Sequence, residues 1–260
     1  MQLARAMLVA CTMLLPTVAL AEKHEIPRDI PMFVMEVVPM TINAADRHGL
    51  VGDIVEEALR RANLVTHVMF VPAKRALTLA PGATDTLIMP LARLKERETS
   101  YTWIAPIVEV QRAFYGLHRQ VDSFEAAKTQ FKSIGVERGT AGLDILLNEG
   151  FSRDQIVEVS DGVTPLRMLL AGRLDAWYSP VSEALSLLKL IDDGHAVEGG
   201  APVGGTFNYV ACSKICNPLI VSKLSASLNA MFADGAVQSI AGRYGDISGV
   251  RIVPPLVPGQ

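Results

Sequence analysis

Along most of the chain, the pattern of apolar and polar residues changes repeatedly between the period of a strand and that of a helix. The clearest helix covers residues 53–62, where Asp53 is placed to cap the first turn. The apolar face of this helix consists of Ile54, Val55, Ala58, Leu59 and Ala62. Strands are expected over 65–71 and 86–91, on either side of a short helix over 73–80. This order predicts a parallel sheet covered by helices.

A second block of the same kind follows a long β-like run over residues 107–117. Its expected strands cover 133–136, 155–159 and 174–178, and its expected helices begin after Ser123, cover 139–150 and 164–171, and begin again at Pro180. The glycine-rich stretch 199–205 interrupts the alternation, and a strand at 206–212 and a helix at 217–233 follow. The last helical segment is too short to fold alone. We therefore expect two α/β blocks, with the C-terminal helices packed on the first.

The first 21 residues have the layout of a secretory signal peptide. Arg5 is their only charged residue, an apolar run follows it, and Ala19-Leu20-Ala21 provides a small-x-small cleavage site. The run is shorter than the roughly 20 residues that a membrane-spanning helix needs. Lipidation at Cys11 stays open, because Leu8-Val9-Ala10-Cys11 has the order of a lipoprotein cleavage box. We expect cleavage before Glu22 and a mature protein that is in the periplasm and not embedded in the membrane.

Composition limits the class of protein further. The 260 residues carry a formal net charge of −3, and 50% of them are hydrophobic, which suits one large domain or two lobes. A weakly acidic chain with dispersed charge gives no electrostatic reason to expect a nucleic-acid partner. Two cysteines remain after cleavage, Cys212 and Cys216. In an oxidising compartment they are candidates for a disulfide, with two buried free thiols as the alternative.

Several catalytic motifs are absent from the sequence. It contains no Gly-x-Ser-x-Gly, no P-loop and no His-Glu-x-x-His. The five histidines are scattered without the spacing of metal ligands, and the stretch 199–205 does not match Gly-x-Gly-x-x-Gly. We therefore expect no metal and no cofactor, and we interpret the glycine-rich stretch as a connection or hinge.

Four further stretches combine into a pattern. They are Gly49-Leu50-Val51-Gly52-Asp53-Ile54-Val55-Glu56-Glu57-Ala58-Leu59, the segment 90–97 with Trp103-Ile104-Ala105-Pro106, Gly135-Val136-Glu137-Arg138-Gly139-Thr140, and Leu170-Ala171-Gly172-Arg173-Leu174-Asp175-Ala176. In order and spacing, the chain resembles the family-3 periplasmic solute-binding proteins, the amino-acid-binding group associated with ABC importers. Each motif is weak alone, but together they cover nearly the whole mature chain.

The resemblance implies a fold class and a division into lobes. The fold is the α/β, two-lobed periplasmic binding protein-like fold of type II, in which each lobe is a mostly parallel sheet flanked by helices. Two hinge strands join the lobes, which close on a ligand. Lobe 1 would comprise residues 22–107 and 204–260, and lobe 2 would comprise 108–203. The protein is then expected to be a monomer.

The resemblance also implies ligand-binding residues. Arg97 matches the arginine that holds the ligand carboxylate in this family, where its planar fork of donors meets the carboxylate bidentately. Thr140 matches a threonine at a helix N-terminus, where free N–H groups favour an anion. The alternatives are a surface arginine and a plain helix cap. Ser179 stands where many members carry the acid that binds the ligand ammonium.

Four other residues could compensate for the missing acid, namely Glu36, Trp177, Tyr178 and Arg138, although Trp177 and Tyr178 point to opposite faces of one strand, so at most one of these two enters the cleft. The loss of the ammonium site implies a carboxylate-bearing solute that is amino-acid-like but not an ordinary α-amino acid. The leading hypothesis is a non-enzymatic binding protein that delivers this solute to an inner-membrane permease. A sensor or accessory protein without a transporter is the first alternative. A dehydratase-like enzyme acting on a cyclic hydroxy acid, with Glu36 or Glu137 as its acid, is the second.

Overall fold

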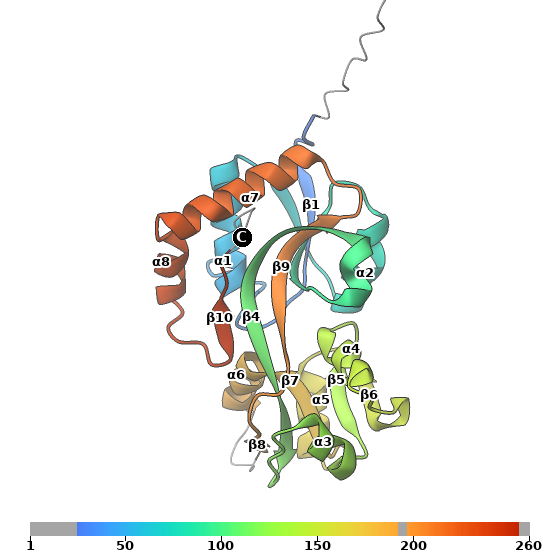
Figure 1. The fold of residues 1–260 in the computed structure, drawn as a ribbon. Helices are drawn as coiled ribbons and strands as arrows, with labels where there is room; N and C mark the ends of the chain where they lie inside the picture. Colours follow the sequence, from blue (N-terminus) through green and yellow to red (C-terminus); the bar gives the residue numbers. More distant parts are fainter. Residues whose placement is uncertain (1–24, 192–196, 255–260) are drawn as a thin grey trace, which may run out of the picture.

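The computed structural model describes residues 25–191 and 197–254, so the predicted signal peptide and Cys11 lie outside the described residues. The strands follow the order β2-β1-β3-β9-β4-β7-β5-β6. Figure 1 shows that this sheet carries one group of helices at each end, which gives two lobes connected by long strands. The fold is the α/β architecture that the alternation of strand and helix patterns predicts.

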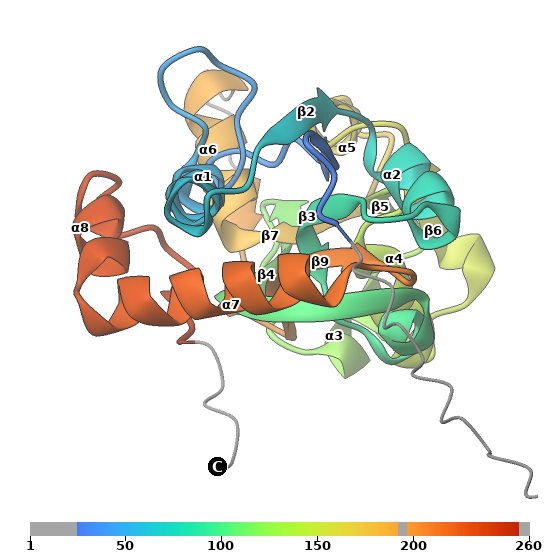
Figure 2. The same ribbon diagram turned by 90° about the horizontal axis from the view of Figure 1, so that it is seen from above.

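Lobe 1 is built on three parallel strands, because β1 pairs with β2 and with β3 in parallel register. Its elements are β1 (Ile30–Val34), α1 (Leu50–Ala62), β2 (Thr66–Phe70), α2 (Ala73–Leu79), a 3-10 turn (Ala80–Gly82), β3 (Leu87–Ala92), a second 3-10 segment (Lys95–Ser100), α7 (Pro218–Ala233) and α8 (Ala236–Gly242). The apolar face of α1 is buried and packs with α7 and α8 in one core cluster. Figure 2 shows α7 running along this lobe, so the C-terminal helices return to the first block as predicted.

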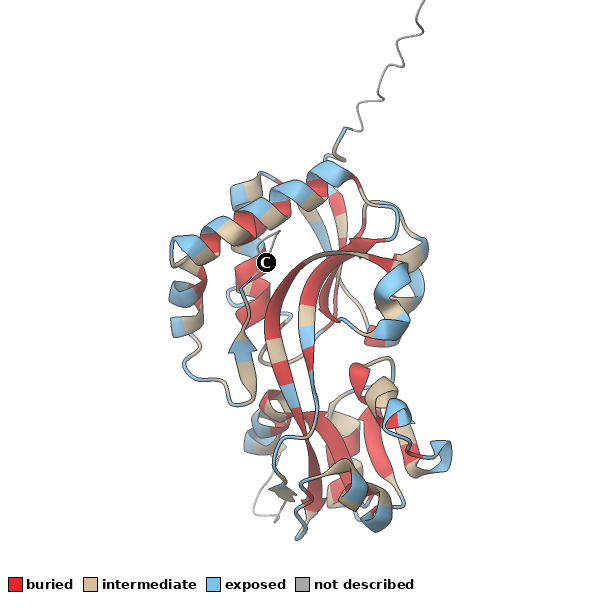
Figure 3. Ribbon diagram, viewed as in Figure 1, coloured by how far each residue is buried: buried red, intermediate tan, exposed pale blue. Residues whose placement is uncertain are grey.

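Lobe 2 repeats the arrangement with β5 parallel to both β6 and β7. Its elements are α3 (Phe124–Gln130), β5 (Ile134–Glu137), α4 (Ala141–Asn148), a 3-10 turn (Arg153–Gln155), β6 (Ile156–Val159), α5 (Val163–Leu170), β7 (Ala176–Pro180), α6 (Val181–Ile191) and β8 (Val197–Gly199). Figure 3 shows β5 and β7 largely buried, while the helices expose their outer faces. Two clusters on opposite faces of this sheet form the lobe's core.

Two strands pass between the lobes, β4 (Tyr101–Leu117) and β9 (Gly205–Ser213). Strand β4 pairs with β9 along residues 101–111 and with β7 along residues 112–115. Apolar side chains up to Val110 belong to the lobe 1 core, and those from Ala113 belong to lobe 2. Arg112 lies at this change, where its N–H donates to the Gly204 carbonyl. A short strand, β10 (Val250–Ile252), pairs with the lobe 1 half of β4.

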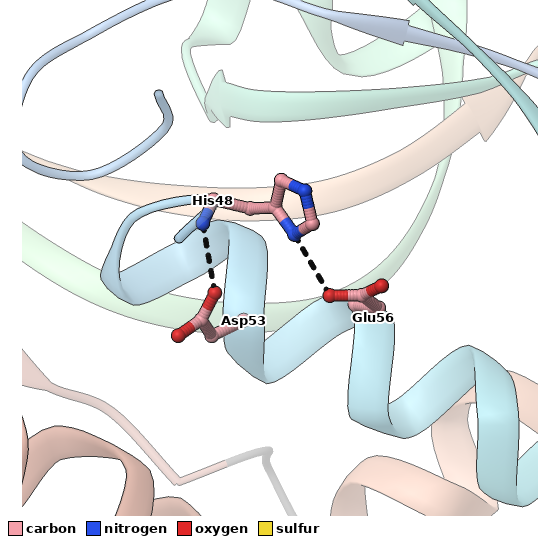
Figure 4. Close-up of side chains that lie close together, drawn as sticks. All are labelled: His48, Asp53 and Glu56. Carbon is pink, nitrogen blue, oxygen red and sulfur yellow. Dashed lines mark hydrogen bonds and ion pairs between the residues drawn. The ribbon is translucent and has the colours of Figure 1, made fainter. Parts of the chain in front are cut away.

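Some local predictions are wrong in detail. Helix α1 begins at Leu50, with Gly49 rather than Asp53 at its N-cap position. The Asp53 carboxylate instead accepts hydrogen bonds from the His48 N–H, at 3.0 Å, and from the Tyr244 hydroxyl, at 2.7 Å. Figure 4 shows the His48 contacts. Strand β4 begins at Tyr101, six residues earlier than predicted, because its first half gains β9 as a partner.

Cys212 and Cys216 are joined by a disulfide, with their Cα atoms 6.0 Å apart. Cys212 is buried near the end of β9, and Cys216 lies just before α7. The bond therefore holds the turn between a hinge strand and the helix that follows it. Over the described ranges, no helix is both long and apolar enough to cross a membrane.

Candidate functional site

A cleft of about 520 Å³ lies between the lobes. Lobe 1 contributes the segment after β1 and the start of α2, and lobe 2 contributes the ends of β5, β6 and β7 and the starts of α4 and α6. These are the carboxyl ends of parallel strands, where open α/β sheets bind ligands. The hinge strand β4 supplies the floor, which includes Val110 and Arg112. The cleft is therefore where a ligand could contact both lobes at once.

Arg112 is the most buried charged group of the cleft. The residue is only 6% exposed, and its Nε has no hydrogen-bond partner in the described chain. Burial lowers the pKa of its guanidinium, and the nearby Tyr178 and Glu183 oppose that shift. One terminal nitrogen of Arg112 lies 3.6 Å from where a Cβ would stand at Gly142, in the first turn of α4. A buried cation with an unused donor needs an anionic or polar partner.

Two acids stand close to Arg112 on the same wall. Glu137 ends β5, and Glu183 lies in the first turn of α6. Both carboxyl groups approach Gly162, with Glu137 Oε2 3.6 Å from where a Cβ would stand and Glu183 Oε1 closer still. The Ser179 hydroxyl donates to Glu183 Oε2 at 3.1 Å. Position 179 is therefore not an acid itself, but its serine is hydrogen-bonded to one, Glu183, which lies about one helical turn further along the chain.

The environment of the two acids favours their neutral forms. Burial, followed by the charges of Glu183 and Asp161, raises the pKa of Glu137 to about 8, against the smaller opposite effect of Arg112. Burial also raises the pKa of Glu183, against the effects of Arg112 and Ser179. Asp161 behaves differently, because hydrogen bonds from the Thr164 backbone and hydroxyl outweigh its burial and lower its pKa. A pKa of about 8 lies above neutrality, so these surroundings favour the protonated form of the Glu137 carboxyl at neutral pH.

Arg97 contributes from lobe 1 and reaches across the cleft. Its side chain is 11% exposed, and its Nη2 donates to Asp144 Oδ2 on α4 at 2.9 Å. Its Nη1 makes a long contact with the Ala92 carbonyl at 3.5 Å. Arg97 thus lines the cleft as expected, but an internal carboxylate of lobe 2 already holds its guanidinium. A ligand carboxylate would have to share the Arg97 guanidinium with Asp144 or displace Asp144 from it.

The structure places Thr140 at the N-cap position of α4, also in the lining. Its hydroxyl donates to the Glu137 carbonyl at 2.8 Å and does not cap the helix. The first-turn N–H groups of α4 consequently have no side-chain cap. A helix end of this kind favours an anion.

The other expected residues are divided between cleft and core. Glu36 is exposed in the cleft lining, and its carboxylate accepts from the Asn43 N–H at 3.2 Å. Tyr178 lines the cleft but is buried, and its hydroxyl donates to the Val203 carbonyl at 2.9 Å. Ser179 lines it too, as the partner of Glu183. Arg138 is not in this lining; it borders a separate hollow with Lys74 and is 3.8 Å from Glu158.

Sequence reasoning missed Arg112 and Glu183. Arg112 is the one charged residue between Glu109 and Leu117. A charge inside a β-rich run is a signal that could have drawn attention to it. Glu183 gave no comparable signal, because an acid in the first turn of a helix is common for electrostatic reasons alone. Only the tertiary structure, in which α6 packs against β4 and β7, shows that the carboxyl groups of Glu183 and Glu137 approach the same point at Gly162.

A second cluster lies away from the cleft. His48, Asp53 and Glu56 offer ligand atoms within 4.8 Å of one another, as Figure 4 shows. His48 Nδ1 lies 2.9 Å from Glu56 Oε2, and Asp53 Oδ2 is 3.4 Å from an Arg243 nitrogen. Because a guanidinium and the Tyr244 hydroxyl already occupy that oxygen, we interpret the cluster as a tie between α1 and the C-terminal segment.

No known family model and no curated protein matches this sequence. Solved structures match the fold. A histidine kinase sensor domain similar to periplasmic binding proteins aligns with a TM-score of 0.76 at 11% identity, over 88% of this chain and 99% of that one. EhuB in complex with hydroxyectoine aligns with a TM-score of 0.74 at 22% identity, over 84% and 88%. An ancestral arginine-binding protein bound to arginine aligns with a TM-score of 0.72 at 15% identity, over 84% and 99%.

These similarities define the class of the fold. It is the α/β fold of the type II periplasmic binding proteins. More particularly, the chain matches the structures of family-3 amino-acid and solute-binding proteins over most of its length. The matched structures include a histidine kinase sensor domain and proteins solved with a bound solute, so the fold alone does not decide this chain's role.

Proposed function

We propose that this protein binds a small, carboxylate-bearing solute between its two lobes, outside the cytoplasm, and delivers it to an ABC-type importer. The observation that carries this proposal is Arg112, a buried cation on the hinge strand that lines the interlobe cleft and whose Nε has no hydrogen-bond partner among the described residues. Arg97 and the uncapped N-terminus of α4 lie on the same cleft and favour the same ligand group.

Closure of the lobes follows from where these groups reside. Arg97 belongs to lobe 1, α4 belongs to lobe 2, and Arg112 lies on the strand that connects them. A ligand that contacts all three stabilises the closed arrangement relative to the open one, which is how a ligand shifts such an equilibrium. A permease can then distinguish the loaded from the empty protein by its shape.

Native mass spectrometry of exported protein tests the proposal, because it would identify a co-purified solute directly. Small-angle scattering with and without that solute should show compaction on binding. The proposal fails if no small carboxylate co-purifies and none induces compaction. N-terminal sequencing addresses the export step: the mature chain should begin at Glu22, and an acylated Cys11 would contradict this.

The sensor role is the second candidate, and one similarity favours it. The histidine kinase sensor domain is covered over 99% of its length, with a TM-score of 0.76. In that role, the closed form would be read by a signalling partner and not by a permease. Pull-down of the ligand-loaded protein on membranes, followed by identification of the retained protein, separates a permease from a kinase.

A further inference from the structure

A second hollow, of about 490 Å³, adjoins the interlobe cleft, and Pro72 and Ser160 line both spaces. Its other lining residues come from α2 of lobe 1 and from the turn after β5 of lobe 2, namely Lys74, Arg75, Thr78, Leu79 and Arg138. Figure 1 shows α2 at the side of lobe 1 that faces lobe 2. Three of these described lining residues are cations, and none is an acid. The space, called the basic hollow below, is therefore positively charged on the walls of both lobes.

The two lobes touch at the edge of the basic hollow. Gly139 follows Arg138, and a Cβ on Gly139 would lie 2.8 Å from the Lys74 nitrogen and 2.9 Å from the Lys74 Cα. The backbone of lobe 2 therefore reaches the backbone of α2 with no room for a side chain between them. Gly139 has φ 81°, in the left-handed region that glycine adopts without strain. This contact brings Arg138 into the same space as Lys74.

No acid neutralises the lobe 1 side of the basic hollow. Lys74 and Arg75 are exposed, and neither forms an ion pair with any residue that the structure describes. On lobe 2, Arg138 Nε is 3.8 Å from Glu158 Oε2. The Glu158 carboxylate forms a much closer ion pair with Arg153. The basic hollow thus holds two cations without an acidic partner in the described chain and a third that is loosely paired.

The hydroxyl groups and the other acid nearby are engaged within the protein. Thr78 Oγ1 donates to the Lys74 carbonyl at 2.8 Å, and Ser160 Oγ donates to Asp161 Oδ2 at 3.1 Å. Asp161 also accepts from the Thr164 N–H at 2.8 Å. None of these bonds involves a cationic group of the basic hollow, so its three positive charges remain available to an outside partner.

We infer that the basic hollow is a second binding site, which takes a multivalent oxyanion such as phosphate or sulfate between Lys74 and Arg75 of lobe 1 and Arg138 of lobe 2. Like charges that approach without a counter-ion repel each other. An oxyanion has several acceptor oxygens, so ammonium and guanidinium groups of both lobes can donate to it at once through charge-assisted hydrogen bonds. The site lies outside the cleft and does not depend on which solute the cleft binds.

An anion that contacts both lobes also affects closure. It stabilises the arrangement in which α2 lies against the turn of Arg138, relative to one in which the lobes have separated. Binding in the basic hollow should therefore favour binding in the cleft, and the reverse holds by linkage. The oxyanion thus acts as an effector and not as the solute of the cleft.

Calorimetric titration of the full mature chain with inorganic phosphate tests the inference, at an ionic strength held constant with sodium chloride so that screening does not change. The proteins compared are wild type, Lys74→Gln, Arg138→Gln and the control Arg173→Gln. Arg173 is an exposed arginine of lobe 2 that lines neither the cleft nor the basic hollow, so its substitution matches the change in charge. Arg112→Gln reports on phosphate that enters the cleft. Circular dichroism confirms that each variant is folded, and small-angle scattering with and without phosphate measures compaction.

We expect wild type to bind phosphate with a Kd of about 1 mM or below and to become more compact in its presence. Lys74→Gln and Arg138→Gln should each bind phosphate at least about fivefold more weakly, because each loses a charged donor. Neither variant should show the compaction. Arg173→Gln should match wild type in both measurements.

Three results would overturn the inference. No binding of phosphate, or equal binding by wild type, Lys74→Gln and Arg138→Gln, would show that these cations form no anion site. Binding that is lost in Arg112→Gln and kept in Arg138→Gln would place the anion in the cleft. Sedimentation with phosphatidylglycerol vesicles that requires Arg138, in a protein that does not bind free phosphate, would assign the cations to a membrane surface. The proposed function is decided separately, by the solute that co-purifies.

Discussion

Substituting Glu137 by glutamine should make the unliganded protein more stable at alkaline pH. The pKa of the Glu137 carboxyl is about 8 in the folded protein and 4.5 as its reference value. Between these values the folded state holds a proton that the unfolded chain releases. The stability of the wild type contributed by this group is therefore fully present below pH 4.5 and is lost as pH rises toward 8. Glutamine stays neutral throughout and removes this loss.

The magnitude follows from the size of the shift. Each pKa unit corresponds to about 1.36 kcal/mol, so a shift of this size corresponds to at most about 5 kcal/mol. Water that enters the cleft when Glu137 ionises reduces this value, because charged sites in proteins respond to an effective dielectric constant well above that of a dry interior. We expect Glu137→Gln to be about 2–5 kcal/mol more stable than wild type at pH 9 and nearly equal to it at pH 4.5.

Urea denaturation of ligand-free protein at pH 4.5, 6, 7, 8 and 9 measures this difference, with the two proteins compared at each pH so that other titrating groups cancel. Glu125→Gln serves as the control, because its exposed carboxyl should give a difference near zero at every pH. The reasoning is refuted if the difference between Glu137→Gln and wild type is constant with pH, or if the variant is the less stable protein at pH 9.

Three further predictions concern other parts of the fold. Arg97→Ala should weaken binding of the co-purified solute by about 2–5 kcal/mol in calorimetry. Arg97→Lys should not restore binding, because the point charge of an ammonium does not replace the planar guanidinium. Unchanged affinity in Arg97→Ala would exclude the residue from the site. Reducing the Cys212–Cys216 bond should lower the free energy of unfolding by about 2 kcal/mol, and an unchanged urea midpoint would contradict this. Gly49→Ala, at φ 86°, would place a methyl 2.5 Å from a backbone oxygen, so thermal melting should show a larger loss than for Gly150→Ala, which has the same φ and open space; equal losses would show that the contact is unimportant.

The order of strands and helices could be predicted from sequence because it depends on local signals. Ser123 caps α3 by accepting from the Ala126 N–H, and Asn217 caps α7 by accepting from the Leu219 N–H. In both cases the residue type and its place before an apolar run are sufficient. The apolar stripe of α1 was likewise visible at its helical spacing and is buried as predicted. Such features need no knowledge of distant residues.

Element ends were less accurate where a distant partner decides them. Aspartate is a residue type that often caps helices, yet Asp53 lies inside α1, whose N-cap position is Gly49. Its carboxylate instead accepts a hydrogen bond from the hydroxyl of Tyr244, far away in the sequence. The first half of β4 contains Pro106 and does not look like a strand, but pairing with β9, more than a hundred residues later, extends it back to Tyr101. A hydrogen-bonded ladder between strands far apart in sequence has no local signature.

The cleft shows the same division most clearly. Sequence motifs led to Arg97, Thr140 and Ser179, and the structure places all three in the lining. The motifs could not show that Asp144 holds Arg97 from the other lobe. Nor could the motifs show that the carboxyl groups of Glu137 and Glu183, which are far apart in the sequence, lie close together in space.

The tertiary structure alone brings Arg112, Glu137 and Glu183 from three elements to one wall and partly withdraws them from water. The pKa of each group depends on this environment. The type of side chain sets only its reference value, and burial and neighbouring charges shift the pKa from there. The sequence by itself therefore determined the two-lobed alternation and the caps of α3 and α7, and three-dimensional packing decided the chemistry of the candidate site.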